Sequence, residues 1–232
     1  MAADLDARLE QVAALGEPVR RALYRFVATQ TEPVTREQAA DAVGVPQHTA
    51  KFHLDRLVAD GLLEADYARP AGRGGPGAGR PAKVYRRSDT EVDVSLPERR
   101  YDLAGRLLVK GMARAERTAS PVRDALDSVA REEGRASGLA HRGGSRGRAT
   151  TNAVIDVLRS DGYEPVRDGD DIVLGNCPFH ALAREETELV CGMNLAYLDG
   201  LTSGLDATLQ PELDPADDRC CVRLRTAAPR RT

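Results

Sequence analysis

The sequence has no tryptophan, few other aromatic residues and no long apolar run. Of its 232 residues, 4% are aromatic and only four are cysteine. No apolar stretch approaches the roughly 18 residues that a membrane-spanning helix needs. The acidic start, MAADLDARLE, differs from a signal peptide, which begins with positive charge. We therefore expect a cytoplasmic protein with no membrane partner, in a compartment where thiols stay reduced.

The cysteines lack the CxxC spacing of a zinc ribbon or a thioredoxin-like redox site. They lie at Cys177, Cys191, Cys220 and Cys221, so the first two gaps contain 13 and 28 residues. In a reducing compartment we expect them to act as metal ligands, reactive thiols or small core residues, and disulfides are the last choice.

The length of the chain suits about two domains, each able to bury a core. The pattern of elements predicts an α+β protein in three segments. Residues 1–97 form a winged helix-turn-helix domain, residues 98–142 form a helical linker that pairs two chains, and residues 143–232 form a small α+β sensor domain with the cysteines. The net charge of -3 does not indicate nucleic acid, but the basic residues are concentrated locally, and this matters more for docking.

Apolar residues at helical spacing predict helices over residues 5–15 and 19–27. Thr35 with Gln38 makes a capping box for a short third helix. The tripeptide at residues 44–46, Gly-Val-Pro, is a tight turn, and a fourth helix runs from there to Gly61. Two helices joined by such a turn are typical of a helix-turn-helix domain.

An acid-free segment follows the fourth helix. Residues 67–87 carry six Arg and Lys residues among Gly and Pro, between Tyr67 and Tyr85, which we assign to two strands. A cationic loop between two strands is the wing of a winged helix. Arg80, held extended by the following Pro81, has the shape that enters a narrow minor groove. A solvated linker is the alternative, but it leaves the upstream helical pattern unexplained.

In a winged helix the second helix of the pair enters the major groove by its amino-terminal residues. Gln and His side chains can bond base edges, while Thr and Lys suit phosphates. The pattern resembles the ArsR-like and DeoR-like bacterial repressors over about residues 8 to 90, and this resemblance implies a homodimer on a palindromic operator in double-stranded DNA. The predicted DNA contacts are Gln47, His48, Thr49, Lys51, Phe52, His53, Arg56, Arg73, Arg80 and Lys83.

The middle of the chain predicts a strand or an extended connector over residues 89–97 and then two helices. The first helix, residues 101–116, has Tyr101 and Met112 on its apolar face. The second begins at Ser120-Pro121 and has Val122 facing inward. These faces pair two chains or pack on the same chain.

The carboxy-terminal segment predicts a helix over residues 151–158, a hairpin turning at residues 168–170, a longer helix over 188–205 and a terminal strand that carries Cys220 and Cys221. Neighbouring strand residues point to opposite faces, so only one of this pair can easily join a common site. Pro178 suits the first position of a helix, which places Cys177 near that helix's amino terminus, where a thiolate is favoured. His180 lies about one turn on.

The segments NCPFHALAREETELVC and DRCCVRLR resemble the carboxy-terminal domain of the Suf-operon repressors, which are iron–sulfur-binding winged-helix regulators. The resemblance implies that Cys177, Cys191 and Cys220 hold a [4Fe–4S] or [2Fe–2S] cluster, with Cys221 as the competing choice for the last ligand. It implies a transcriptional repressor whose operator affinity depends on the cluster.

Three other interpretations remain for this segment. A zinc site of three cysteines and His180 fits the ligand types. A small-molecule effector could bind an apolar pocket without any metal. A thiol enzyme with Cys177 as nucleophile is disfavoured, because no His–carboxylate pair lies near it beyond His180 and the basic wing would have no purpose. We therefore expect a regulator and not an enzyme.

Overall fold

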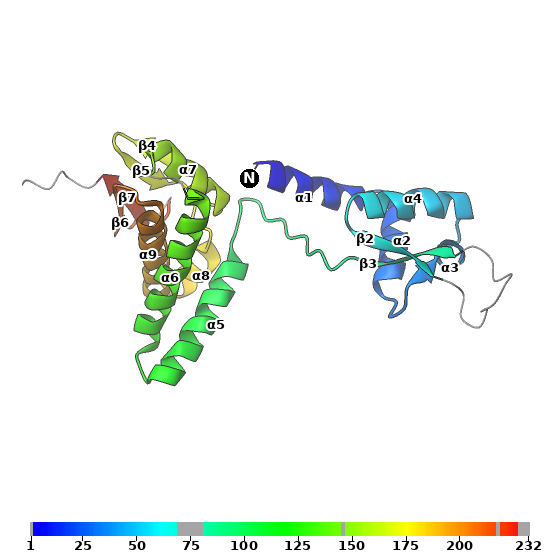
Figure 1. Cartoon of the computed structure of the whole chain (residues 1–232), viewed down its shortest axis with the longest axis horizontal. Helices are drawn as coiled ribbons and strands as arrows, with labels where there is room; N and C mark the ends of the chain where they lie inside the picture. Colours follow the sequence, from blue (N-terminus) through cyan, green and yellow to red (C-terminus); the bar gives the residue numbers. More distant parts are fainter. Residues whose placement is uncertain (1, 69–80, 145–146, 217–218, 227–232) are drawn as a thin grey trace, which may run out of the picture. The chain divides into compact units, whose positions relative to one another are not determined.

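The computed structural model describes residues 2–68, 81–144, 147–216 and 219–226. The chain forms two compact units, Met1–Val94 and Ser95–Thr232, and each is described by itself. Both combine helices with a sheet, as the α+β prediction requires (Figure 1).

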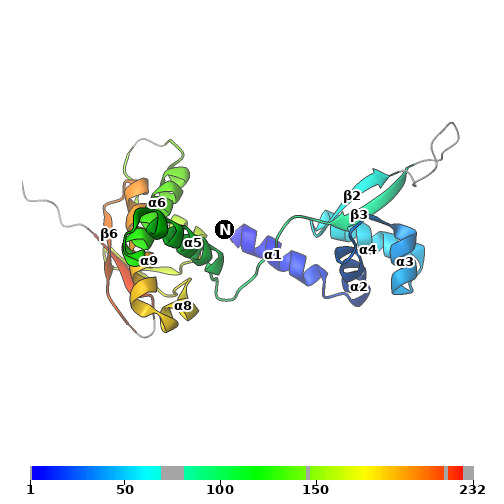
Figure 2. The same ribbon diagram turned by 90° about the horizontal axis from the view of Figure 1, so that it is seen from below.

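The amino-terminal unit packs helices on a small antiparallel sheet, in which β2 and β3 lie side by side (Figure 2). The strand order is β1-β3-β2. Its hydrophobic core includes the buried residues Leu23, Leu54 and Leu57, one from the second helix and two from the fourth. The elements are α1 (Ala2–Ala14), α2 (Pro18–Ala28), β1 (Val34–Thr35), α3 (Arg36–Val43), α4 (Gln47–Ala59), β2 (Leu63–Ala68) and β3 (Ala82–Arg87).

Local signals in the sequence place the ends of these helices. Glu17 caps α2 by accepting hydrogen bonds from two backbone N–H groups. Thr35 and Gln38 form the predicted capping box of α3. Gly44 ends α3 with a φ of 73°, a left-handed conformation that glycine adopts at little cost. The predicted order of helix, turn, helix and two strands is confirmed.

The carboxy-terminal unit has a four-stranded antiparallel sheet with the order β4-β5-β7-β6. Helix α9 packs against this sheet and against α6, and α5 packs on α6 (Figures 1 and 2). Because α9 has neighbours on most of its sides, most of its residues are buried. The elements are α5 (Tyr101–Thr118), α6 (Val122–Arg142), α7 (Thr151–Ser160), β4 (Pro165–Asp168), β5 (Asp171–Leu174), α8 (His180–Glu185), α9 (Thr187–Leu205), β6 (Leu209–Leu213) and β7 (Val222–Thr226).

Four glycines bring α6 and α9 into backbone contact. Gly134 and Gly138 of α6 face Gly200 and Gly204 of α9. A Cβ atom added to any of them would overlap a backbone carbonyl oxygen of the other helix. The spacing of four residues puts each pair on one helix face, so the two small faces fit together along a full turn.

The central helices belong to the carboxy-terminal unit. We predicted residues 98–142 as a segment separate from 143–232, but Leu107 and Leu126 share one core with α9 and the sheet. Residues 89–97 form no strand, so of the two predicted alternatives, a strand or a connector, the connector remains.

The predicted apolar face of α5 is only partly buried. Leu107 packs in the core, whereas Tyr101 and Met112 are exposed, because the buried side of that helix is set by Leu103, Leu107 and smaller residues packed on α6. Val122 was predicted to face inward, but it is half exposed at the first position of α6. Within the described residues, no helix is both long and apolar enough to cross a membrane.

We predict that Gly200→Ala destabilises the protein by at least about 2 kcal/mol, because the new methyl group meets a backbone carbonyl that can move only if the two helices separate. Gly192→Ala is the matched control on the same helix. Its Cβ would have no neighbour nearer than the Asp127 carboxylate at 3.7 Å. The control should therefore be neutral, or more stable by up to about 1 kcal/mol. Urea unfolding measures both; equal midpoints for Gly200→Ala and the wild type would contradict the close contact.

Candidate DNA-binding helix and cysteine cluster

Helix α4 presents its amino-terminal half to solvent. Pro46 precedes its first residue, and Ala50, Leu54 and Leu57 fix the helix on the core. The opposite side carries exposed polar, basic and aromatic side chains. These are Gln47, His48, Lys51, Phe52 and Arg56, while Thr49 is half-buried. Phe52 is 64% exposed, which is unusual for an aromatic residue of a small domain.

His53, which was predicted to contact DNA, has a largely buried side chain. It follows Ala50 by three residues and precedes Leu57 by four, so it lies beside the buried face of α4. Its side chain is 11% exposed, and Nδ1 lies 3.5 Å from both the Glu17 carboxylate and the Arg20 Nε. His53 therefore ties α4 to the start of α2.

Asp55 joins α4 to the sheet. One of its carboxylate oxygens accepts hydrogen bonds from Lys83 Nζ at 2.6 Å and from the Tyr85 hydroxyl at 3.0 Å. The other accepts from Lys51 Nζ at 2.7 Å. Partial burial alone raises the pKa of Asp55, but these three hydrogen bonds outweigh it and hold that pKa at about 2. Lys83 was predicted to bind phosphate, and in the free protein its charge is matched by Asp55.

The predicted wing lies largely outside the described residues. Arg73 and Arg80 fall within residues 69–80, and this part of the prediction stays untested. The two strands that flank the segment form as expected, with Tyr67 in β2 paired to Lys83 in β3.

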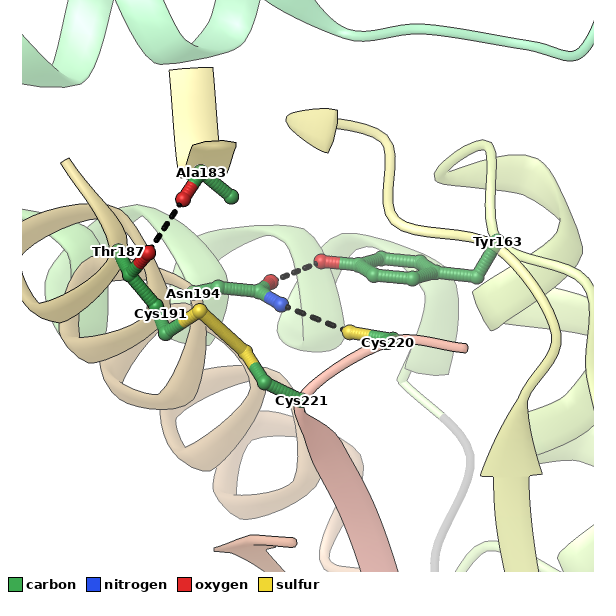
Figure 3. The surroundings of a disulfide bond; sticks show 7 residues. All are labelled: Tyr163, Ala183, Thr187, Cys191, Asn194, Cys220 and Cys221. Carbon is green, nitrogen blue, oxygen red and sulfur yellow. Dashed lines mark hydrogen bonds between the residues drawn. A yellow bond between two sulfur atoms is a disulfide. The ribbon is translucent and has the colours of Figure 1, made fainter. Parts of the chain in front are cut away.

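The cysteines come together from three parts of the carboxy-terminal unit. Cys191 of α9 forms a disulfide with Cys221, and their Cα atoms lie 6.5 Å apart (Figure 3). Both residues were predicted as reduced. Cys220 and Cys221 precede β7 and are not part of it, which corrects the predicted strand. Their side chains diverge, with Cys221 toward Cys191 and Cys220 toward Asn194.

Cys177 and Cys220 are free thiols, and both are buried. The Cys220 sulfur accepts a hydrogen bond, at 3.3 Å, from the Asn194 side-chain amide. The Tyr163 hydroxyl holds that amide by donating to Asn194 Oδ1 at 2.5 Å (Figure 3). Two buried polar side chains thus hold the position of the Cys220 sulfur.

Cys177 does not lie at a helix terminus as predicted. Pro178 occupies a turn closed by a hydrogen bond from the His180 N–H to the Cys177 carbonyl, and α8 begins only at His180. The pKa of Cys177 is nevertheless lowered, to about 7. The Cys220 thiol contributes most, burial opposes it, and the Phe179 N–H and the charge of Arg99 add to the lowering.

The cysteines form two pairs and not one cage. No three His, Cys, Asp or Glu side chains among the described residues are grouped so that they could hold a metal ion. Thiolates are the ligand type of an iron–sulfur cluster, but the disulfide occupies two of the four cysteines. Reduction of Cys191–Cys221 is therefore a condition for such a centre.

Sequence reasoning missed Asp55, Asn194 and Tyr163. Asp55 follows Lys51 by four residues on the helix, an ion-pair spacing that the sequence does display. Asn194 is an isolated amide in the apolar stretch of α9, and a buried amide needs partners. Nothing in the local sequence indicates that its partners are Tyr163 and Cys220.

Residues 15–65 match a family of helix-turn-helix domains. The matched region covers α2, α3 and α4 and reaches the start of β2. No curated protein and no solved structure matched the chain. The match supports a DNA-binding transcriptional regulator with a winged-helix domain.

We predict that Asp55 contributes pH-dependent stability. Its pKa is about 2 in the folded protein and about 3.9 in an unfolded chain. A depressed carboxyl pKa stabilises the fold above the unfolded value, and this contribution is lost as the pH falls through the folded value. Asp55→Asn should therefore be less stable than the wild type at pH 7, and the difference should shrink below about pH 4.

Urea unfolding at several pH values between 7 and 3 measures this difference. Asp41→Asn, at an exposed position of α3, is the control and should follow the wild type throughout. If the difference in unfolding free energy between the wild type and Asp55→Asn stays constant with pH, the assigned ion pairs are contradicted.

Proposed function

We propose that this protein is a homodimeric transcriptional repressor that binds a palindromic operator through α4 and senses a thiol-bound cofactor through its carboxy-terminal unit. The observation that carries the DNA-binding part is the exposed, polar amino-terminal half of α4, which follows the turn of a helix-turn-helix. Gln47 and His48 read base edges, and Lys51, Arg56 and Lys83 bind phosphates.

Asp55 controls how the basic side chains meet DNA. It pairs Lys51 and Lys83 in the free protein, so both ammonium groups are held next to one another along α4 and β3. A phosphate that enters this site competes with the carboxylate for the same donors. The hydroxyl of Tyr85 remains as a further partner for Asp55 when a lysine turns to the phosphate.

The exposed side of α5 is the surface that we assign to the second copy of the chain. Val109 is 68% exposed and Met112 is 61% exposed on this helix. Large apolar side chains that adjoin one another on a helix are typical of an interface. A homodimer places two copies of α4 on two half-sites, which explains a palindromic operator.

The cofactor that we propose is an iron–sulfur cluster, held by the reduced thiols of Cys177, Cys191 and Cys220, with Cys221 able to replace Cys220. The convergence of four cysteines from three segments supports it. Ordering these thiols would couple the cofactor to the packing of α9, and through α6 and α5 to the surface assigned to the dimer.

Zinc is the second candidate cofactor. Cys177 and His180 line the same pocket, which favours a site of three cysteines and one histidine. The two candidates differ in their need for His180.

We predict that Gln47→Ala relaxes the preference at one base pair in each half-site, at a cost of about 1 to 3 kcal/mol against the preferred base. Selection from randomised DNA sites gives the preference, and binding at a fixed salt concentration gives the cost. Gln30→Ala is the matched control, because Gln30 follows the end of α2 and lies outside α4. An unchanged site preference in Gln47→Ala would refute the assignment of this residue to base recognition.

We predict that protein purified without oxygen, with a reductant, is brown and contains iron and acid-labile sulfide. Single Ser replacements of Cys177 or Cys191 should remove the iron and the visible absorbance, while loss of Cys220 should be rescued in part by Cys221. His180→Ala should keep the iron of a cluster but lose most of the metal of a zinc site. His48→Ala, in the other unit, is the matched control and should retain all metal.

Metal analysis decides between the candidates. Colourless protein with about one zinc per chain would contradict the iron–sulfur proposal and support the zinc site. Metal-free, folded protein with full operator affinity would contradict both.

A further inference from the structure

Two pairs of cysteines lie in the carboxy-terminal unit, in different oxidation states. Cys191 and Cys221 are already joined, whereas Cys177 and Cys220 are free thiols of the same buried core. The Cys220 N–H donates to the Leu174 carbonyl at 3.0 Å, three residues before Cys177, and Arg219 lines the same pocket as Cys177. The two cysteines therefore lie on adjoining segments, and the Cys220 thiol is also the largest cause of the lowered pKa of Cys177. The second pair is therefore placed to form a disulfide of its own.

A pocket of about 230 Å³ reaches Cys177 from solvent. It is lined by Arg99, Asn176, Cys177, His180 and Arg219, among others. Cys177 itself is only 9% exposed. The pocket can therefore admit a small oxidant, and we expect a peptide-sized disulfide such as oxidised glutathione to reach the recessed sulfur poorly.

The sulfur atoms of Cys177 and Cys220 differ in their access to the pocket. Cys177 faces the pocket beside two guanidinium groups, and the Arg99 Nη1 is fixed by a 2.8 Å hydrogen bond to the Cys177 carbonyl. Cys220 is fully buried behind it and is held by Asn194. An oxidant that enters the pocket reaches Cys177 first, and Cys220 lies ready to react with the product.

We propose that this pocket is an oxidation site for small hydroperoxides, with Cys177 as the attacked thiol and Cys220 as the resolving thiol. The Cys177 sulfur attacks one oxygen of hydrogen peroxide, the O–O bond breaks, and the products are a sulfenic acid on Cys177 and water. The Cys220 sulfur then attacks the Cys177 sulfur. An S–S bond forms, the hydroxyl of the sulfenic acid leaves, and the Cys220 proton completes a second water.

This step oxidises two thiols and reduces one peroxide. It leaves the unit with two disulfides and no free thiol among its four cysteines. Peroxide oxidation and a thiolate-bound cofactor then exclude each other, because the same sulfur atoms serve both. The inference deepens the sensor role proposed above and rests on that role only for its effect on DNA binding.

The test uses the full-length Cys191→Ser/Cys221→Ser double variant, which keeps only Cys177 and Cys220. After chelation of metals, the protein is treated with hydrogen peroxide and cleaved with trypsin without reductant. Mass spectrometry should find residues 168–184, with Cys177, linked to residues 220–223, with Cys220. The linked product should disappear on reduction. The absence of this product, with both thiols still free, would overturn the proposal.

The order of attack is tested with Cys220→Ser, which removes the resolving thiol. A dimedone-type probe should then label Cys177 at least tenfold more than it does in the wild type, where Cys220 consumes the sulfenic acid. Cys177→Ser is the matched control and should give no label at position 220. Label on Cys220 in that control, at the level seen on Cys177, would overturn the assigned roles. Equally fast reaction of wild-type Cys177 with oxidised glutathione would overturn the selection for small oxidants.

These measurements report on peptides and not on DNA. A linked product in a protein that binds no operator would leave the oxidation site standing and contradict the proposed function. If operator binding responds to the cofactor but no linked product forms, the proposed function stands and the oxidation site is contradicted.

Discussion

The backbone contact between α6 and α9 is the constraint on which the carboxy-terminal unit depends. Glycines at Gly134, Gly138, Gly200 and Gly204 remove the side chains that would keep the two helices apart. Because the helices meet at their backbones, the orientation of α9 about its own axis is fixed. Cys191 and Asn194 lie three residues apart on that helix, so the same constraint fixes the direction in which both side chains point.

The buried polar side chains of this unit depend on that orientation. Tyr197 of α9 donates a hydrogen bond to the Asp161 carboxylate at 2.7 Å, and Asn194 bonds both Tyr163 and Cys220. Burial raises the pKa of Asp161, against the opposing effects of Tyr197 and the charge of Arg100. Buried polar groups without partners cost free energy, so these contacts select one arrangement of α9 against the segments before β4 and β7.

In the amino-terminal unit the Asp55 carboxylate fixes the orientation of α4. Asp55 links α4 to β3 through Lys83 and Tyr85, and it holds Lys51 on its own helix. His53 and Glu17 connect the other side of α4 to α2. The helix proposed to read DNA is thus fixed by polar contacts on two sides and by Leu54 and Leu57 beneath, while its outer face stays free for base edges and phosphates.

Most of the order of elements was predictable from the sequence alone, because local signals determine it, but the short strands β1 and β6 were not predicted. Apolar periodicity gave the helices, and the capping box at Thr35 and the left-handed glycine at Gly44 gave their ends, since each acts within one turn of chain. The exposed residues at the start of α4 followed from the same periodicity. The hairpin between β4 and β5, which also needed only local information, was predicted correctly.

The tertiary structure decided which side chains meet. Spacing could not show that Cys191 faces Cys221 or that Cys177 faces Cys220, because these pairs are 30 and 43 residues apart and are joined only by the packing of α9 near the sheet. Pro178 was a local signal for a helix start, but it lies in a turn closed by the His180 N–H, and α8 begins only at His180. The exposed side of α5 likewise depended on which of its faces packs on α6. A sequence determines the elements through interactions between near neighbours, whereas contacts between distant residues are set by the shapes that the elements bury together.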